Sequence, residues 1–162
     1  MEIERKFLIS GFPDLPVAES SEMEQGYLCV KPVVRIRKKT VDGRSGYRLC
    51  IKGEGTLARE EIELPLTPEV YGRLKALLPM PPVRKLQKVY PLPDGLQLEC
   101  NLVDAGTSDA FYYAEVEFQS VEQAQAFVPP AFLLQDVTEC PGYSMSSYWT
   151  KKLNEKQGEM GK

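Results

Sequence analysis

Short segments in which apolar and charged residues alternate make up most of the chain, and turn residues separate them. This period of two is typical of antiparallel strands. It predicts strands at residues 1–9, 22–30, 33–40, 46–53, 57–64, 83–91, 96–104 and 111–119. Residues 67–79, 120–128 and 144–155 have helical caps and spacing, and apolar positions such as Val70, Leu77 and Val128 predict that these helices pack onto the sheet. The predicted fold class is α+β and mainly β.

The charged residues of each predicted strand share one face. In the first strand Glu2, Glu4 and Lys6 have one parity, and Ile3 and Phe7 have the other. The same alternation places the following residues on the charged face: Arg35 and Arg37, Arg48, Cys50 and Lys52, Arg59, Glu61 and Glu63, Glu99 and Asn101, and Glu115 and Glu117.

Two architectures satisfy this alternation. One is an open sheet with a solvated face, which is common in antiparallel proteins. The other is a barrel whose charged faces line a water-filled lumen, with the apolar faces outward under helices. The charged face is rich in Glu, Arg and Lys and poor in Ser and Thr, which favours the barrel without excluding the open sheet.

Length and composition indicate one soluble domain. We expect a single domain at residues 1–155 and a flexible tail at 156–162, which is polar and contains glycine. No apolar run is long enough for a membrane span, and the first residues do not resemble a signal peptide, so we expect a cytoplasmic protein without a membrane partner. The four cysteines are scattered without metal-site spacing, which predicts reduced and unliganded thiols.

Two absences restrict the chemistry. The chain has no histidine, which excludes histidine-based catalysis and histidine-ligated metals. Any metal must therefore bind oxygen ligands, which favours Mg²⁺ or Mn²⁺. A net charge of −3 argues against nucleic acid as a partner.

The remaining charged residues suggest a metal and a phosphate compound. Glu2 and Glu4 lie two residues apart on one strand, as do Glu115 and Glu117, and four converging carboxylates would repel one another without a divalent cation. Guanidinium groups bind phosphate in a bidentate manner and lysine binds it as a point charge, which suits a polyphosphate. The basic residues in question are Lys6, Arg35, Arg37, Lys52 and Arg59.

These residues resemble the motifs of a known family. Glu2-Ile3-Glu4-Arg5-Lys6 is similar to the E-x-E-x-K signature of the CYTH superfamily, the triphosphate tunnel metalloenzymes. Further segments resemble later family motifs in the same order, over residues 1–150 in all. They are Gln25–Leu28, Arg35–Arg37, Tyr47–Gly53, Arg59–Glu63, Ala114–Phe118, Asp136–Thr138 and Tyr143–Ser144.

The resemblance implies an eight-stranded antiparallel barrel that forms a tunnel and hydrolyses a triphosphate, most simply inorganic tripolyphosphate, with Mg²⁺ or Mn²⁺. It implies metal ligands at Glu2, Glu4, Glu61, Glu63, Glu115 and Glu117. It implies phosphate binding by Lys6, Arg35, Arg37, Lys52, Arg59 and Lys85, and catalytic roles for Glu4, Glu117 and Tyr27. Tyr27 would accept a proton, although a packed strand tyrosine is an equal alternative.

Some positions depart from the family pattern. Gln87 stands where an arginine is common, Asn101 where an acid is frequent, and Gly142 where a basic residue usually precedes the tyrosine. Arg84 and Lys88 have the wrong parity to replace the missing arginine. An adenylyl cyclase and a non-catalytic polyphosphate-binding or nucleotide-binding module therefore remain alternatives. A homodimer through outer strands or helices is a further possibility.

Overall fold

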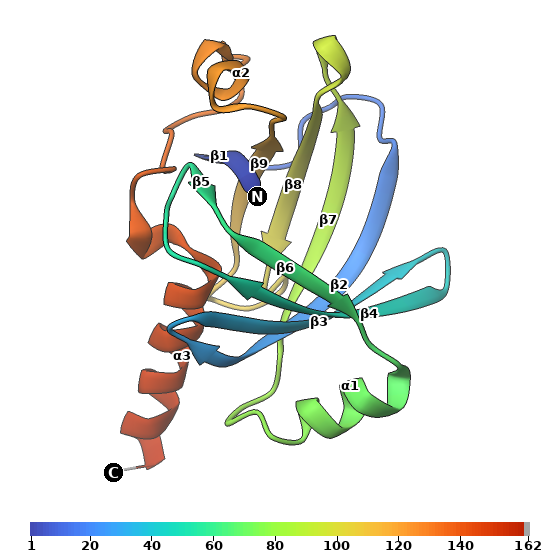
Figure 1. The fold of residues 1–162 in the computed structure, drawn as a ribbon, viewed down its shortest axis with the longest axis vertical. Coiled ribbons are helices and arrows are strands. Elements are labelled where there is room, and N and C mark those ends of the chain that lie inside the picture. The colour runs from blue at the N-terminus through green and yellow to red at the C-terminus, as the bar shows by residue number, and fades with distance from the viewer. Residues whose placement is uncertain (161–162) are drawn as a thin grey trace.

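Strand pairing in the computed structural model, which describes residues 1–160, wraps the chain into an almost closed antiparallel barrel (Figure 1). The strand order is β5-β1-β9-β8-β7-β2-β3-β4-β6. The strands are β1 (Glu2–Leu8), β2 (Glu19–Val30), β3 (Val33–Val41), β4 (Arg44–Lys52), β5 (Ala58–Arg59), β6 (Glu61–Pro65), β7 (Val83–Pro91), β8 (Gln97–Val103) and β9 (Phe111–Glu117).

The barrel closes through β5 and β6, which are separated by Glu60 alone. Arg59 of β5 pairs with Glu2 of β1, whereas Glu61 of β6 pairs with Lys52 of β4. The single strand predicted at 57–64 is therefore two short strands, because the chain changes its pairing partner within it. Counted as one staggered strand, they give the eight positions of the predicted barrel, and that prediction of the fold is confirmed.

An apolar layer covers the outside of one wall of the barrel. Phe7, Leu98 and Val116 come from the outward faces of β1, β8 and β9 and are almost fully buried. Helix α2 (Val121–Ala126) lies over β1, and its first turn is capped by Ser120 Oγ, which accepts a hydrogen bond from Gln123 N at 3.0 Å. Burial of the apolar faces outside leaves the charged faces directed into the barrel.

A second apolar cluster fills one end of the barrel. Tyr27, Val83 and Tyr113 pack there against Met145 and Trp149 of α3 (Met145–Met160). The sequence predicts that this helix ends at residue 155, and that prediction is wrong by five residues. The helix continues because Glu, Lys and Gln, which have high helix propensity, follow residue 154. The predicted tail at 156–162 is therefore helical up to 160, and residues 161–162 lie outside the described residues.

Helix α1 (Pro68–Lys75) contacts the barrel beside β3 and β4. Thr67 caps it as expected, because its Oγ1 accepts a hydrogen bond from Val70 N at 3.2 Å. The buried residue of α1 is Tyr71, whereas Val70 is 40% exposed and Leu77 is 73% exposed. The predicted apolar stripes are therefore wrong at Val70, at Leu77 and at Val128, which is 84% exposed. Other predicted positions do pack against the buried clusters, namely Leu78, Ala124 and Phe127.

Two short 3-10 helices, Pro93–Gly95 and Pro141–Tyr143, complete the elements. Among the described residues, no helix has the length and apolarity that a membrane crossing requires. Cys29, Cys50, Cys100 and Cys140 are free. Ile62 and Leu64 of β6 are about half exposed on the outer surface, and the homodimer stays a prediction.

Candidate functional site

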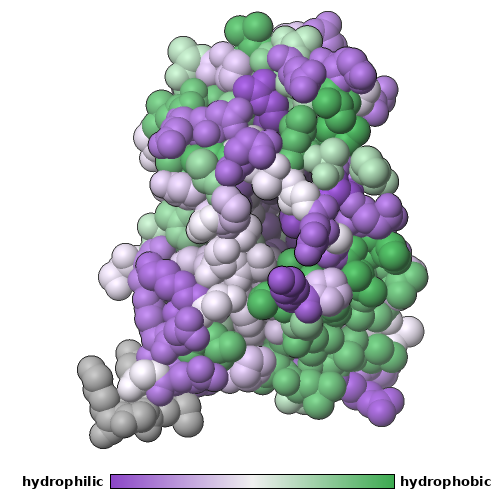
Figure 2. Space-filling view, turned by 60° about the vertical axis from the view of Figure 1, so that its left-hand side comes forward, coloured by the Kyte–Doolittle hydropathy of each residue, from purple (hydrophilic) through white to green (hydrophobic). Residues whose placement is uncertain are grey.

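The barrel encloses a cavity of about 920 Å³. Figure 2 shows a hollow in one face of the molecule, with hydrophilic residues at its rim. All thirteen site residues predicted from the sequence line the cavity, which decides between the two architectures in favour of the barrel with a charged lumen. They are Glu2, Glu4, Lys6, Tyr27, Arg35, Arg37, Lys52, Arg59, Glu61, Glu63, Lys85, Glu115 and Glu117.

The two predicted glutamate pairs meet on adjacent strands. Glu4 of β1 is the register partner of Glu117 of β9, and Lys6 is the register partner of Glu115. Burial, together with the charge of Glu115 and the hydrogen bond to it, raises the pKa of Glu4 well above its ordinary value. Burial also opposes ionisation of Glu115, but the hydrogen bond from Glu4 and the nearby lysines lower its pKa to about 2. Ionisation is therefore favoured at Glu115 and disfavoured at Glu4.

The pKa values of a second pair of carboxyl groups, Glu2 and Glu61, shift in opposite directions. Burial and the hydrogen bond with Glu2 raise the pKa of Glu61 to about 8. Burial alone would raise the pKa of Glu2, but the hydrogen bond from Glu61 and the charge of Lys52 lower it. Glu99, which is outside the predicted ligand set, also lines the cavity, and burial beside Glu115 raises its pKa to about 7.

The basic residues divide into two groups by their partners. Lys52 Nζ donates to both carboxylate oxygens of Glu2 at 3.2 Å, and Arg59 Nε donates to Glu2 Oε1 at 3.4 Å. Arg35 is 8% exposed, and its Nε has no hydrogen-bond partner. Lys85 is 5% exposed and donates to the neutral hydroxyl of Tyr113 at 2.9 Å. Among the described residues, two of the six basic residues of the site are therefore paired with Glu2, and the other four form no ion pair with a carboxylate. These four are Lys6, Arg35, Arg37 and Lys85.

Tyr27 is held by packing and by a neutral hydrogen bond. Its hydroxyl accepts from Gln25 Nε2 at 3.1 Å, and its ring centroid lies 5.7 Å from that of Trp149. Burial raises the pKa of Tyr27 above its ordinary value. A phenol that keeps its proton at neutral pH is a poor proton acceptor, which favours the packing role over the catalytic one.

The positions that depart from the family pattern form a neutral part of the wall. Gln87 Nε2 donates to Asn101 Oδ1 at 3.1 Å, and both side chains are buried. Arg84 is exposed on the other face, and Lys88 lies 4.5 Å from the ring centroid of Phe12. Neither replaces the missing arginine, as the parity argument predicted. Gly142 lies in the 3-10 helix Pro141–Tyr143, with open space where a side chain would project.

Comparison with known proteins identifies relatives over most of the chain, although no family model matches it. The chain is 35% identical over 145 residues to an inorganic triphosphatase of Nitrosomonas europaea, which covers 88% of this chain and 92% of that protein. The crystal structure of an inorganic triphosphatase superposes with a TM-score of 0.63 at 30% identity, covering 91% of this chain and 93% of that one.

More distant structures share the fold alone. A Hippeastrum protein described as an adenylyl cyclase with a dominant triphosphatase activity has a TM-score of 0.52 at 17% identity, over 77% of this chain and 83% of that one. The ordered motifs, the charged barrel interior and the relative that matches nearly the whole chain agree with one another. The chain belongs to the CYTH superfamily of triphosphate tunnel metalloenzymes.

Proposed function

We propose that the protein hydrolyses a triphosphate inside this cavity with the help of Mg²⁺ or Mn²⁺, and that inorganic tripolyphosphate is its substrate. The observation that carries the proposal is the buried Arg35 guanidinium, whose Nε lacks a partner in an enclosed cavity. A buried cation is costly without an anion beside it. Lys85 has the same need, and a polyphosphate supplies several charges along one chain.

The carboxylates suit a hard divalent cation. Glu4 and Glu115 influence each other's ionisation, and a divalent cation would relieve the repulsion between their charged forms. Every donor contributed by Glu2, Glu4, Glu115 and Glu117 is a carboxylate oxygen, which is the ligand that Mg²⁺ and Mn²⁺ prefer. These four residues would hold the ion, and Glu61 and Glu63 would support them.

The remaining residues of the cavity would bind the triphosphate and act on it. Arg35, Arg37 and Lys85 would hold the phosphate oxygens in line for attack, and they would stabilise the charge that develops on the leaving oxygen. A carboxylate of the β1 and β9 group would orient the attacking water. A divalent ion supplies further charge neutralisation at the phosphoryl oxygens when it is bound. The cavity volume of about 920 Å³ leaves room for a triphosphate and water.

The relative's name supports the choice of substrate, because the Nitrosomonas protein is an inorganic triphosphatase. The test measures orthophosphate released from tripolyphosphate, pyrophosphate, ATP and thiamine triphosphate, with and without each cation. We expect release from tripolyphosphate only when Mg²⁺ or Mn²⁺ is present. Cyclic AMP formed from ATP would favour an adenylyl cyclase, and tight binding without turnover would favour a binding module.

Glu4→Gln tests the assignment of the acid group. Loss of one ligand removes several kcal/mol of transition-state stabilisation, so the rate should fall at least about a hundredfold. Glu22→Gln makes the same charge change on the exposed outer face of β2 and serves as the matched control. Turnover without a divalent cation, or a Glu4→Gln protein as active as Glu22→Gln, would refute the proposal.

A further inference from the structure

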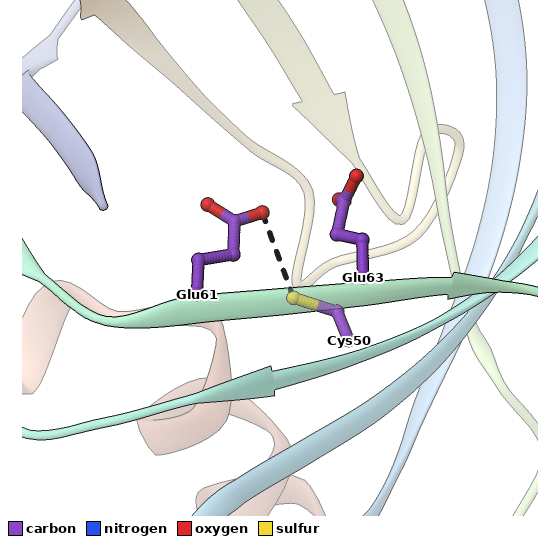
Figure 3. A group of neighbouring side chains, drawn as sticks. All are labelled: Cys50, Glu61 and Glu63. Atoms are coloured by element: carbon purple, nitrogen blue, oxygen red, sulfur yellow. Dashed lines mark hydrogen bonds between the residues drawn. The ribbon is translucent and has the colours of Figure 1, made fainter.

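A thiol faces two carboxylates in the wall of the barrel. Figure 3 shows Cys50 of β4 below Glu61 and Glu63 of β6, with the Cys50 sulfur joined to Glu61 and the two glutamates projecting to the same side of β6. One ligand atom from each residue lies within 4.8 Å of the other two. Cys50 Sγ is 3.6 Å from Glu61 Oε1. Cys50 and Glu63 are register partners, so strand pairing fixes the group.

The distances suit a thiophilic cation. A tetrahedral Zn²⁺ ion, with bonds of about 2.3 Å to sulfur and about 2.1 Å to oxygen, sets a sulfur-to-oxygen separation of about 3.6 Å. The Cys50–Glu61 pair already has this separation. Glu63 can adjust its position by side-chain rotation, because this exposed residue has only a long 3.8 Å ion pair with Arg48 among the described residues.

The surrounding charges suit the occupied site. A thiolate, two carboxylates and a divalent ion carry a net charge of −1. Arg35 is the register partner of Cys50, it is nine-tenths buried, and its Nε has no hydrogen-bond partner. Lys52 is the register partner of Glu61. These two cations flank the group and would balance its remaining negative charge.

We infer that Cys50, Glu61 and Glu63 form a site for a thiophilic divalent cation such as Zn²⁺ or Cd²⁺, and that an ion bound there inhibits the enzyme. Sulfur favours these ions over Mg²⁺ and Mn²⁺, which prefer oxygen. The thiol proton leaves to solvent on binding. The bound ion would stand in the tunnel wall between Arg35 and Lys52, where it obstructs the triphosphate; only this inhibitory role rests on the proposed function.

The first experiment measures binding directly and does not depend on activity. Cd²⁺ added to the metal-free protein should produce the ultraviolet charge-transfer absorbance of a cadmium–thiolate bond. Cys50→Ser should remove that absorbance. Cys140→Ser is the matched control, because Cys140 lies at the cavity beside Pro141 and outside this group, and the variant should keep the band. Absence of the band in the natural protein, or its persistence in Cys50→Ser, would overturn the inference.

The second experiment measures inhibition by Zn²⁺ at saturating Mg²⁺, with each protein referred to its own rate without Zn²⁺. The half-inhibitory Zn²⁺ concentration should rise at least roughly tenfold in Cys50→Ser, since even the loss of an outer-shell partner typically weakens metal binding by that much. Equal inhibition of both proteins would overturn the inhibitory role. If the protein released no phosphate from any substrate, the proposed function would fail, and the Cd²⁺ absorbance would still decide whether the site exists. Thermal unfolding confirms that both serine variants are folded.

Discussion

The Glu2 carboxylate pairs with two basic residues inside the tunnel, and Glu2→Gln tests how much this pairing contributes to stability. Glu2 is about one-tenth exposed and accepts both contacts of Lys52 at 3.2 Å as well as that of Arg59 at 3.4 Å. Glutamine keeps the shape of the side chain and removes its charge. The variant therefore removes the one carboxylate that forms ion pairs with Lys52 and Arg59 among the described residues.

The structure sets the size of the effect. Removal of one partner from a buried ion pair typically costs about 3–5 kcal/mol. Water in the cavity hydrates part of the exposed charge, and Arg59 is 21% exposed, so we expect a loss of about 2–4 kcal/mol in the free energy of unfolding. For a chain of this length that corresponds to a decrease in Tm of about 4–16 °C.

A bound anion should restore much of this loss. Tripolyphosphate without metal can neutralise Lys52 and Arg59 in the variant, whereas in the natural protein it must compete with Glu2 for both. Tripolyphosphate should therefore raise the Tm of Glu2→Gln more than that of the natural protein.

The assay is thermal unfolding by calorimetry at pH 7, with EDTA, with and without tripolyphosphate. Glu54→Gln is the control, because Glu54 is exposed at the cavity and makes no ion pair in the part of the chain that the structure describes. The reasoning is refuted if Glu2→Gln and Glu54→Gln unfold at the same temperature. It is also refuted if tripolyphosphate stabilises Glu2→Gln no more than the natural protein.

Two further predictions concern a buried lysine and an outer arginine. Burial and the charge of Arg37 lower the pKa of Lys85 to about 7, so the free site loses a positive charge as the pH rises through 7. Calorimetric titration at pH 6 and pH 8 should therefore show that the affinity for metal-free tripolyphosphate falls more steeply in the natural protein than in Lys85→Met. Parallel pH profiles of the two proteins would contradict this. Arg5 donates to Asp136 Oδ2 and to two backbone carbonyl oxygens outside the barrel. Arg5→Met should therefore lower the free energy of unfolding in urea by about 2–4 kcal/mol and leave tripolyphosphate turnover unchanged. A loss of turnover at a temperature where the variant is folded would contradict this placement of Arg5.

Local alternation predicted the face on which most of the charged tunnel residues lie, although Arg48 was also placed on that face and does not line the cavity. Glu2, Glu4 and Lys6 share a parity, and the buried apolar cluster outside the barrel requires that parity to face inward. A period of two fixes the face of every residue once one face is assigned. Features that depend on a change of partner were less predictable, as the division of residues 57–64 at Glu60 shows.

Individual side-chain contacts between strands were not predicted from the sequence, unlike the convergence of the two glutamate pairs. Cys50 is eleven residues from Glu61, and only the pairing of β4 with β6 makes them neighbours. Glu99 had the inward parity but no motif to distinguish it, and the charge of Glu115 that raises its pKa comes from the adjacent strand. The end of α1 was overestimated because Leu77 continues a helical spacing that no neighbouring element covers.

The pairing of Glu2 has a consequence for how the two ligands of the tunnel act on each other. Glu2 is a predicted metal ligand, and in the metal-free protein it occupies Lys52 and Arg59, which are predicted to bind phosphate. A carboxylate that turns to a divalent cation releases both basic side chains, so cation and triphosphate should each strengthen the binding of the other by the same factor. Glu2→Gln removes the shared group, and the factor by which Mg²⁺ tightens tripolyphosphate binding should then fall toward one. An undiminished factor in that variant would show that the coupling arises elsewhere in the tunnel.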